Sequence, residues 1–196
     1  SNAPEQVGTD TDWVYVDGGQ VHSLAIKSDG SLWAWGLNST GELGIGNTTD
    51  QNLPIQVGTD IDWVEVSAGG YHTLGLKSDN TLWAWGYNLV GQLGDDTNAQ
   101  KEVPTQIGTD TTWTDISAGF EFSMGIKSDK SLWSWGFNGN GQLGNGSTTQ
   151  ANIPTPVESR AGWLMVDAGS AFGFAIAEDH TLFAWGYNEG GQLGLG

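Results

Sequence analysis

Apolar and polar side chains alternate at a period of two over short segments that are rich in aromatic and β-branched residues. This period is typical of β-strands, whereas an amphipathic helix repeats every 3.6 residues. The first unit of the pattern predicts strands over Trp13–Val16, Ser23–Lys27 and Ser31–Trp35, and a weaker fourth strand near Ile55–Val57 in the next unit. The chain is therefore predicted to be all-β.

The third predicted strand is apolar on both faces. Leu32 and Ala34 point to one face, and Trp33 and Trp35 point to the other. A lone hairpin would leave one apolar face in water, so each sheet is predicted to lie between two others, as blades do in a β-propeller. The 11 Trp rings are interpreted as core and not as a platform for carbohydrate or for photochemistry.

The pattern recurs four times without drift, at a period of 50 residues. Fixed self-similarity of this length is the signature of stacked repeat units. The period is shared by Trp13, Trp63, Trp113 and Trp163, by Trp35, Trp85, Trp135 and Trp185, and by the Gly-(Gln/Glu)-Leu-Gly tetrapeptides that begin at Gly41, Gly91, Gly141 and Gly191.

One repeat domain accounts for nearly the whole chain. The N-terminal residues 1–3, Ser1-Asn2-Ala3, resemble the remnant of a cleaved tag and are excluded from the fold. The predicted units are repeat 1 at 4–53, repeat 2 at 54–103, repeat 3 at 104–153 and a truncated repeat 4 at 154–196. Each is expected to supply a blade of four antiparallel strands.

Two sets of connections are expected to emerge at opposite ends of the strands. The Ser-Asp-Gly type turns, with Asp29 and its counterparts, share one end with the Gly-Thr-Asp turns and hardly change between repeats. At the other end the repeats diverge, and residues free to differ on a repeated scaffold are candidates for recognition. The candidate partner-binding residues are Gln20, Val21, Tyr71, Leu89, Val90, Phe120, Glu121 and Ser170.

The net charge of −17, with 6 Lys and Arg against 23 Asp and Glu, argues against nucleic acid and anionic membranes as partners. A protein with a basic patch would instead be steered toward the chain. The chain has no Cys, which excludes disulfides and thiolate metal sites. No motif for a cofactor or a catalytic group is found, so no cofactor and no enzymatic activity are predicted.

Histidine and aspartate offer the remaining candidates for chemistry. His22 and His72 occupy a repeat position that holds Phe in the other two units, which favours packing over catalysis, and His180 is expected in a solvated turn. The aspartates of the Gly-Thr-Asp turns match no calcium loop in their spacing. These aspartates are Asp10, Asp12, Asp60, Asp62 and Asp110.

Four motifs together resemble the repeat of the regulator-of-chromosome-condensation family. They are Val/Ile-Ser/Asp-Ala/Gly-Gly, His-Ser/Thr-Leu, Leu-Trp-Ala-Trp-Gly-x-Asn and Gly-Gln-Leu-Gly, and the match covers nearly everything from Pro4 to Gly196. The resemblance implies a propeller, usually of seven blades, each a four-stranded antiparallel sheet. Four units instead of seven imply a partial propeller, an eight-bladed ring of two chains or a closed four-bladed ring. Self-association through exposed terminal blades is therefore expected.

The family resemblance implies several functions. High-affinity protein binding favours a non-catalytic protein-interaction scaffold, which is the function we predict. Guanine-nucleotide exchange on a small GTPase is the alternative, and a cell-surface adhesion or carbohydrate-binding repeat is a weaker one that a secretion signal would favour. Ultraviolet sensing uses a Gly-Trp-Arg-His-Thr variant, but the stretch Gly19-Gln20-Val21-His22-Ser23 has no Trp. The sequence assigns no compartment, although a secreted or cell-surface location fits the third function.

Overall fold

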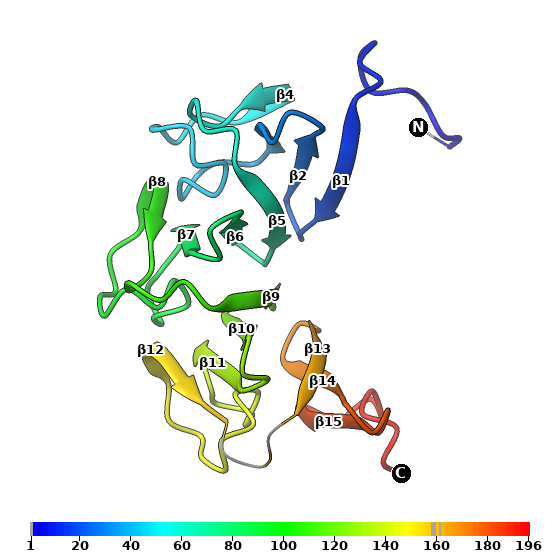
Figure 1. Ribbon diagram of the computed structural model, residues 1–196, viewed down its shortest axis with the longest axis vertical. Coiled ribbons are helices and arrows are strands. Elements are labelled where there is room, and N and C mark those ends of the chain that lie inside the picture. The colour runs from blue at the N-terminus through cyan, green and yellow to red at the C-terminus, as the bar shows by residue number, and fades with distance from the viewer. Residues whose placement is uncertain (1, 158–159, 161) are drawn as a thin grey trace.

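The computed structural model describes residues 2–157, 160 and 162–196. The described residues form β-sheets that follow one another along an arc, with the N- and C-termini at its two ends (Figure 1). Ser1 of the predicted tag remnant, and Glu158 and Ser159 near the start of the fourth repeat, lie outside the described residues. The all-β prediction is confirmed, and the arc is a partial propeller.

Each sheet is an antiparallel blade whose strands follow chain order from the inside of the arc to the outside. Blade 1 contains β1 (Trp13–Gly18), β2 (His22–Lys27), β3 (Leu32–Gly36) and β4 (Gln51–Gln56). Blade 2 contains β5 (Trp63–Ala68), β6 (His72–Lys77), β7 (Leu82–Gly86) and β8 (Lys101–Gln106). Blade 3 contains β9 (Trp113–Ala118), β10 (Phe122–Lys127), β11 (Leu132–Gly136) and β12 (Ala151–Pro156). Blade 4 contains β13 (Trp163–Ala168), β14 (Phe172–Ala177) and β15 (Leu182–Gly186).

The structure has strands at the predicted positions, but the observed ends of the strands differ from the predicted ends. The first strand extends two residues further, to Gly18, and the outermost strand is Gln51–Gln56, whereas the sequence predicted Ile55–Val57. Pro54 hid the outer strand from the sequence pattern, because proline cannot donate to a ladder. It is tolerated here since β4 is an edge strand that pairs only with β3.

The core lies between neighbouring blades. Leu32 and its neighbours on β2 and β3 pack against Trp63 and Val66 of β5 and Trp85 of β7, and all of these side chains are buried. The interfaces between blades 2 and 3 and between blades 3 and 4 repeat this arrangement. Both faces of an inner blade are therefore covered by other blades, as the two-sided apolar pattern predicted.

Hairpin turns join the second and third strands of each blade and require a left-handed residue. Gly30 has a φ of 81°, and the equivalent Asn80, Lys130 and His180 have φ values of 62°, 66° and 62°. Glycine and asparagine adopt this conformation readily, whereas Lys130 and His180 adopt it at a cost. The exposed turn position of His180 is also confirmed.

Tryptophan burial is less uniform than the sequence predicted. Trp63, Trp85, Trp113, Trp135 and Trp163 are at most 3% exposed. The Trp33, Trp83 and Trp133 series lies at the ends of the strands and is only half-buried. There one side of each ring contacts a lysine side chain, while Trp83 and Trp133 also pack against the core between blades.

Candidate functional site

The arc has two edges, at opposite ends of the strands. The Asp edge consists of the hairpin turns at 28–30, 78–80, 128–130 and 178–180 with the turns that precede each inner strand. The loop edge consists of the connections at 19–21, 69–71, 119–121 and 169–171 with the long loops at 37–50, 87–100, 137–150 and 187–196. Backbone hydrogen bonds from Ser28 to Asp12 and from Leu37 to Val21 confirm this predicted grouping.

A lysine is held between two indole rings on the Asp edge of each of the first three blades. The Nζ atom of Lys77 lies 4.9 Å from the ring centre of Trp63 and 4.5 Å from that of Trp83. Its ammonium also lies 2.5 Å from Asp60 and 3.1 Å from Asp62. Lys27 and Lys127 occupy equivalent slots, so the aspartates considered for calcium pair with lysine.

Blade 4 fills the same slot from a different position in the chain. Ala177 stands where the other blades have lysine. The guanidinium of Arg160 lies 5.6 Å from the ring centre of Trp163 and 5.0 Å from that of Phe183, and 3.2 Å from Asp179. A cation between two aromatic rings is thus part of the Asp edge in every blade.

A buried asparagine fixes each long loop on the opposite edge. The Oδ1 atom of Asn88 accepts a hydrogen bond from the backbone N–H of Leu93, and its Nδ2 donates to the carbonyls of Thr97 and Ala99. Asn38 and Asn138 repeat these contacts, and all three side chains are fully buried. The loop edge therefore has a rigid frame that does not depend on its exposed side chains.

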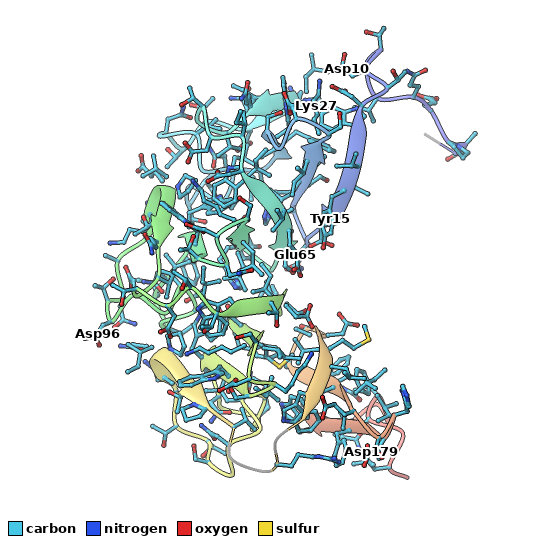
Figure 2. The ribbon with its side chains drawn as sticks, in the orientation of Figure 1. Asp10, Tyr15, Lys27, Glu65, Asp96 and Asp179 are labelled. Carbon is cyan, nitrogen blue, oxygen red and sulfur yellow. The ribbon has the colours of Figure 1, made fainter. Side chains whose placement is uncertain are left out.

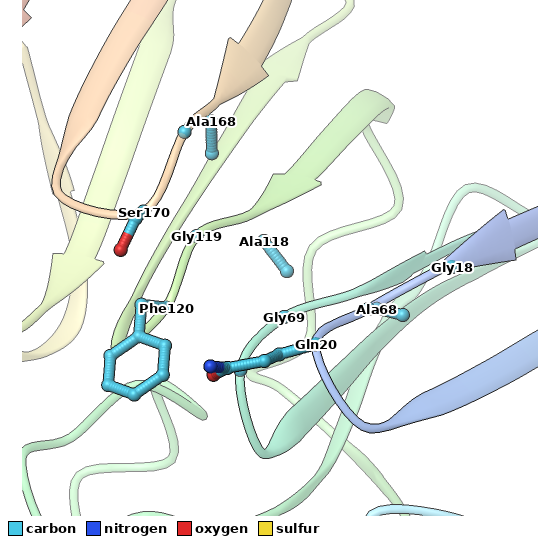
Figure 3. A pocket seen from close by; sticks show the side chains of 12 residues that line it. Gly18, Gln20, Ala68, Gly69, Ala118, Gly119, Phe120, Ala168 and Ser170 are labelled. Carbon is cyan, nitrogen blue, oxygen red and sulfur yellow. The ribbon is translucent and has the colours of Figure 1, made fainter. Parts of the chain in front are cut away.

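Three of the candidate residues surround one cavity on this edge. Gln20, Phe120 and Ser170 line a cavity of about 580 Å³ formed by the four short connections of the blades. The side chain of Gln20 extends toward the ring of Phe120 (Figure 3). The remaining lining is mostly glycine and alanine, which leaves the cavity open to a ligand from outside.

Aromatic rings gather next to this cavity. The ring of Tyr71 lies 5.9 Å from that of Phe120 and 6.5 Å from that of Tyr87, in edge-to-face geometry. Tyr87 was not among the predicted site residues. It follows the Trp-Gly pair, and its repeat position holds Leu37, Phe137 and Tyr187 elsewhere. Variation of apolar type at this position was the signal that could have identified it.

The other candidates divide between exposed and structural positions. Leu89 is 63% exposed at the tip of a long loop, beside the half-buried Val90, whose N–H donates to Gln92. Val21 and Glu121 are half-buried, and their carbonyls accept hydrogen bonds from the start of the long loops. Leu89 is accessible to a partner, whereas the backbones of Val21 and Glu121 also hold the loop frame.

The inner strands carry a row of acidic groups that sequence reasoning missed. The Glu65 carboxylate accepts a hydrogen bond from the N–H of Ile116, and the Asp115 carboxylate accepts one from Val166 in the next blade. Burial, with the nearby charge of Asp115, raises the pKa of Glu65 to about 7. Burial also raises the pKa of Tyr15, which lies on the adjacent inner strand, to about 12 (Figure 2).

His22 and His72 are core residues, as predicted. Nε2 of His22 lies 2.9 Å from the hydroxyl of Thr73, and Nε2 of His72 lies 2.9 Å from that of Ser123, both in the following blade. Burial lowers the pKa of His22 to about 4 and that of His72 to about 3. Both rings are therefore neutral at pH 7 and join adjacent blades.

Two searches of the described residues gave negative results. No group of three or more His, Cys, Asp or Glu side chains in residues 2–157, 160 and 162–196 is placed to hold a metal ion. In the same part of the chain no helix has the length and apolar character that crossing a membrane requires.

Stacked antiparallel blades with glycine-rich connections place this chain among the repeat propellers. Models of the regulator of chromosome condensation (RCC1) repeat match residues 29–76, 79–126 and 129–176, and a second model of this repeat matches 13–42, 63–92 and 113–142. The chain belongs to this family, as the sequence motifs predicted.

Solved propellers share the fold at low identity. Human WBSCR16 has a TM-score of 0.86 at 23% identity, over 96% of this chain and 51% of that protein. Prp20p from Saccharomyces cerevisiae has a TM-score of 0.88 at 24% identity, over 98% and 50%. The Arabidopsis thaliana ultraviolet-B receptor UVR8 is 47% identical over 36 residues, 18% of this chain and 8% of the receptor. The chain spans about half the length of the solved propellers it matches.

Proposed function

We propose that this chain is a non-catalytic protein-interaction scaffold that binds a partner through its loop edge. The exposed and half-exposed apolar side chains of Tyr71, Phe120 and Leu89, set on a frame that repeats without them, carry this proposal. Aromatic and aliphatic anchors beside an open cavity are the usual centre of a protein interface. The catalytic alternatives have no comparable support, because the two buried histidines contact hydroxyl groups of the core.

The partner has a basic surface. A net charge of −17 attracts such a surface over several ångströms and repels an acidic one. The Prp20p structure is described together with that protein's binding to Gsp1p and histones, and histones are basic proteins. We also propose that copies of the chain associate through their end blades.

Guanine-nucleotide exchange is the second candidate, because the fold likeness to Prp20p is close and that protein is described with Gsp1p. A nucleotide-release assay with a small GTPase of the source cell tests it. Release that the chain accelerates in proportion to its concentration supports exchange, and release at the intrinsic rate argues against it.

Site-specific photo-crosslinking in extracts of the source cell tests the loop edge as the binding surface. A photoreactive residue at Leu89 is expected to capture a partner, while the same probe at Ile61, which is 64% exposed on the Asp edge, captures none. Tyr71→Ala and Phe120→Ala should remove the product from the Leu89 probe. Equal capture from both positions, or none from Leu89, would contradict the proposal.

A further inference from the structure

The internal blade interfaces show what a complete interface contains. Between blades 1 and 2 the following blade contributes Val66, Trp63 and Trp85. The preceding blade contributes leucines and isoleucines such as Leu32 and Ile26. Val66 and Leu32 are both fully buried there. The exposed fraction of a side chain on an end blade can therefore be compared with that of its counterpart at an internal interface.

The same residues are exposed at both ends of the arc. Val16, the counterpart of Val66, is 71% exposed on blade 1. Leu182 is 62% exposed on blade 4, whereas its three counterparts are at most 1% exposed. Leu182 also borders a cavity of about 300 Å³ lined by Met165, Phe174 and Ile176. Each end thus presents one half of an interface that the chain builds three times internally.

Polar groups at the two ends are complementary as well. The indole Nε1 atoms of Trp85, Trp135 and Trp185 donate to the carbonyls of Glu42, Gln92 and Gln142 of the preceding blade at 3.0, 2.9 and 2.8 Å. Blade 1 presents the equivalent donor, Trp35, and blade 4 presents the equivalent carbonyl, that of Gln192. The structure gives neither atom such a partner within the described residues.

A second set of polar contacts has the same complementarity. The N–H of Ala68 donates to Asp17 at 2.6 Å, and the N–H of Ala168 donates to Ser117 at 2.8 Å. By the repeat, the N–H of Gly18 on blade 1 is the donor that matches the Asp167 carboxylate on blade 4. Apolar and polar groups at the two ends therefore share one register.

We infer that two copies of this chain associate head to tail, so that blade 1 of each packs on blade 4 of the other and eight blades close a ring. This inference rests on the proposed self-association and names its partner, its faces and its register. Eight blades lie within the usual range of propellers, about four to eight. The second copy also completes the mouth of the cavity lined by Gln20, Phe120 and Ser170, because four of the eight short connections around the axis come from each copy.

Sedimentation equilibrium of the chain and three variants tests the inference. The unmodified chain is expected to have twice the mass of one chain, and either Val16→Asp or Leu182→Asp should halve it. Val64→Asp is the matched control, because Val64 is 52% exposed inside the arc and its counterpart in repeat 3 is the polar Thr114. Val16 and Leu182 are exposed in the single chain, so circular dichroism should show that both variants fold.

Mixing the two monomeric variants distinguishes head-to-tail pairing from other arrangements. The mixture retains one intact blade 1 and one intact blade 4, so a dimer should reappear, and it should be weaker than the unmodified dimer because one of its two contacts is lost. A Val16→Asp chain that still dimerises alone would show blade 4 pairing with itself and would overturn the inference. A mass that rises without limit would overturn closure, and a monomer at every concentration would overturn self-association while leaving the loop-edge proposal intact.

Discussion

The two edges of the arc differ in what the repeat preserves. On the Asp edge both the backbone and the side chains recur, because Lys27, Lys77 and Lys127 fill the same slot. On the loop edge only the frame recurs, fixed by buried asparagines, while the exposed residues change. The exposed side chains of the loop edge can change without loss of the fold, so they are available for recognition. For this reason we place the partner on the loop edge.

Lys27, Lys77 and Lys127 on the Asp edge are paired with aspartate within the chain. Each lysine lies close to aspartates at the ends of the same blade and beneath two aromatic rings. On the loop edge the ring of Tyr71 contacts those of Tyr87 and Phe120, and all three rings remain partly exposed. An incoming protein can bury these rings without first breaking an internal ion pair.

Removal of a frame asparagine should have the largest effect. Asn88→Ala leaves the N–H of Leu93 and the carbonyls of Thr97 and Ala99 without their partner, and should lower the free energy of unfolding by about 3 kcal/mol. Urea denaturation measures this loss. Asn188→Ala is the control, because Asn188 is half-buried and accepts a bond from Leu193 in a more open loop. Equal losses in the two variants would contradict a specific role for the buried frame.

The second largest effect is expected from the acidic row on the inner strands, as a change in how the free energy of unfolding depends on pH. The pKa of Glu65 rises from 4.5 to about 7 on folding, so the folded state binds the proton more tightly. The contribution of Glu65 to the free energy of unfolding is fully present below pH 4.5 and is lost as the pH rises through about 7. Glu65→Gln should make the decline in the free energy of unfolding over this pH range smaller by about 2 kcal/mol, a figure reduced for partial solvent exposure.

Thermal unfolding of the unmodified chain and of Glu65→Gln between pH 4.5 and 8 measures the effect. Glu102→Gln, on the outer strand β8, is the control and should leave the slope unchanged. A slope that Glu65→Gln does not alter would show that Glu65 is charged in the folded chain throughout this range. Asp115, whose pKa burial also raises, contributes a decline of the same sign.

The cation slot of the Asp edge should give a smaller loss. Lys77→Ala removes the contacts with Trp63 and Trp83 and leaves Asp60 and Asp62 without their cation, at about 1–2 kcal/mol. Lys77→Met retains the apolar stem and should lose about half as much. Urea denaturation compares the two variants, and partner binding should be unchanged in both. A loss of binding would show that the Asp edge also takes part in recognition.

Substitutions at the exposed loop tip should change stability least. Leu89→Asp is expected to alter the free energy of unfolding by no more than about 0.5 kcal/mol, because Leu89 is 63% exposed. It should nevertheless abolish binding of the partner identified by crosslinking. Ile61→Asp places the same change on the Asp edge and should leave binding intact. The reverse pattern would assign recognition to the Asp edge.

The strands were predictable because each has a short-range cause. Alternation predicted Trp13–Val16, within the observed strand Trp13–Gly18, and the two-sided apolar strand around Trp33 and Trp35 required stacked sheets. Strand β4 was predicted too late in the chain, because Gln51, Asn52 and Pro54 carry no apolar alternation. Its position depends on pairing with β3, which a local pattern does not contain.

The candidate site was predictable in place and only partly in detail. Divergence between repeats located Gln20, Phe120 and Ser170, which meet around one cavity. It did not separate the exposed Leu89 from Val21, which is half-buried and whose carbonyl holds a loop. It also missed the acidic row, because the raised pKa of Glu65 arises from burial against the next blade, and that contact spans a full repeat.

Because β4 (Gln51–Gln56) spans the boundary between repeat 1 and repeat 2, the sequence period and the physical blade are out of phase. A cut at residues 53 and 54 would divide a strand, whereas a cut in the connection at 57–62 passes between whole blades. Blade transplantation, deletion or circular permutation should therefore succeed at the second junction and fail at the first. A module exchanged at residues 53 and 54 would therefore carry only part of an outer strand at each of its ends.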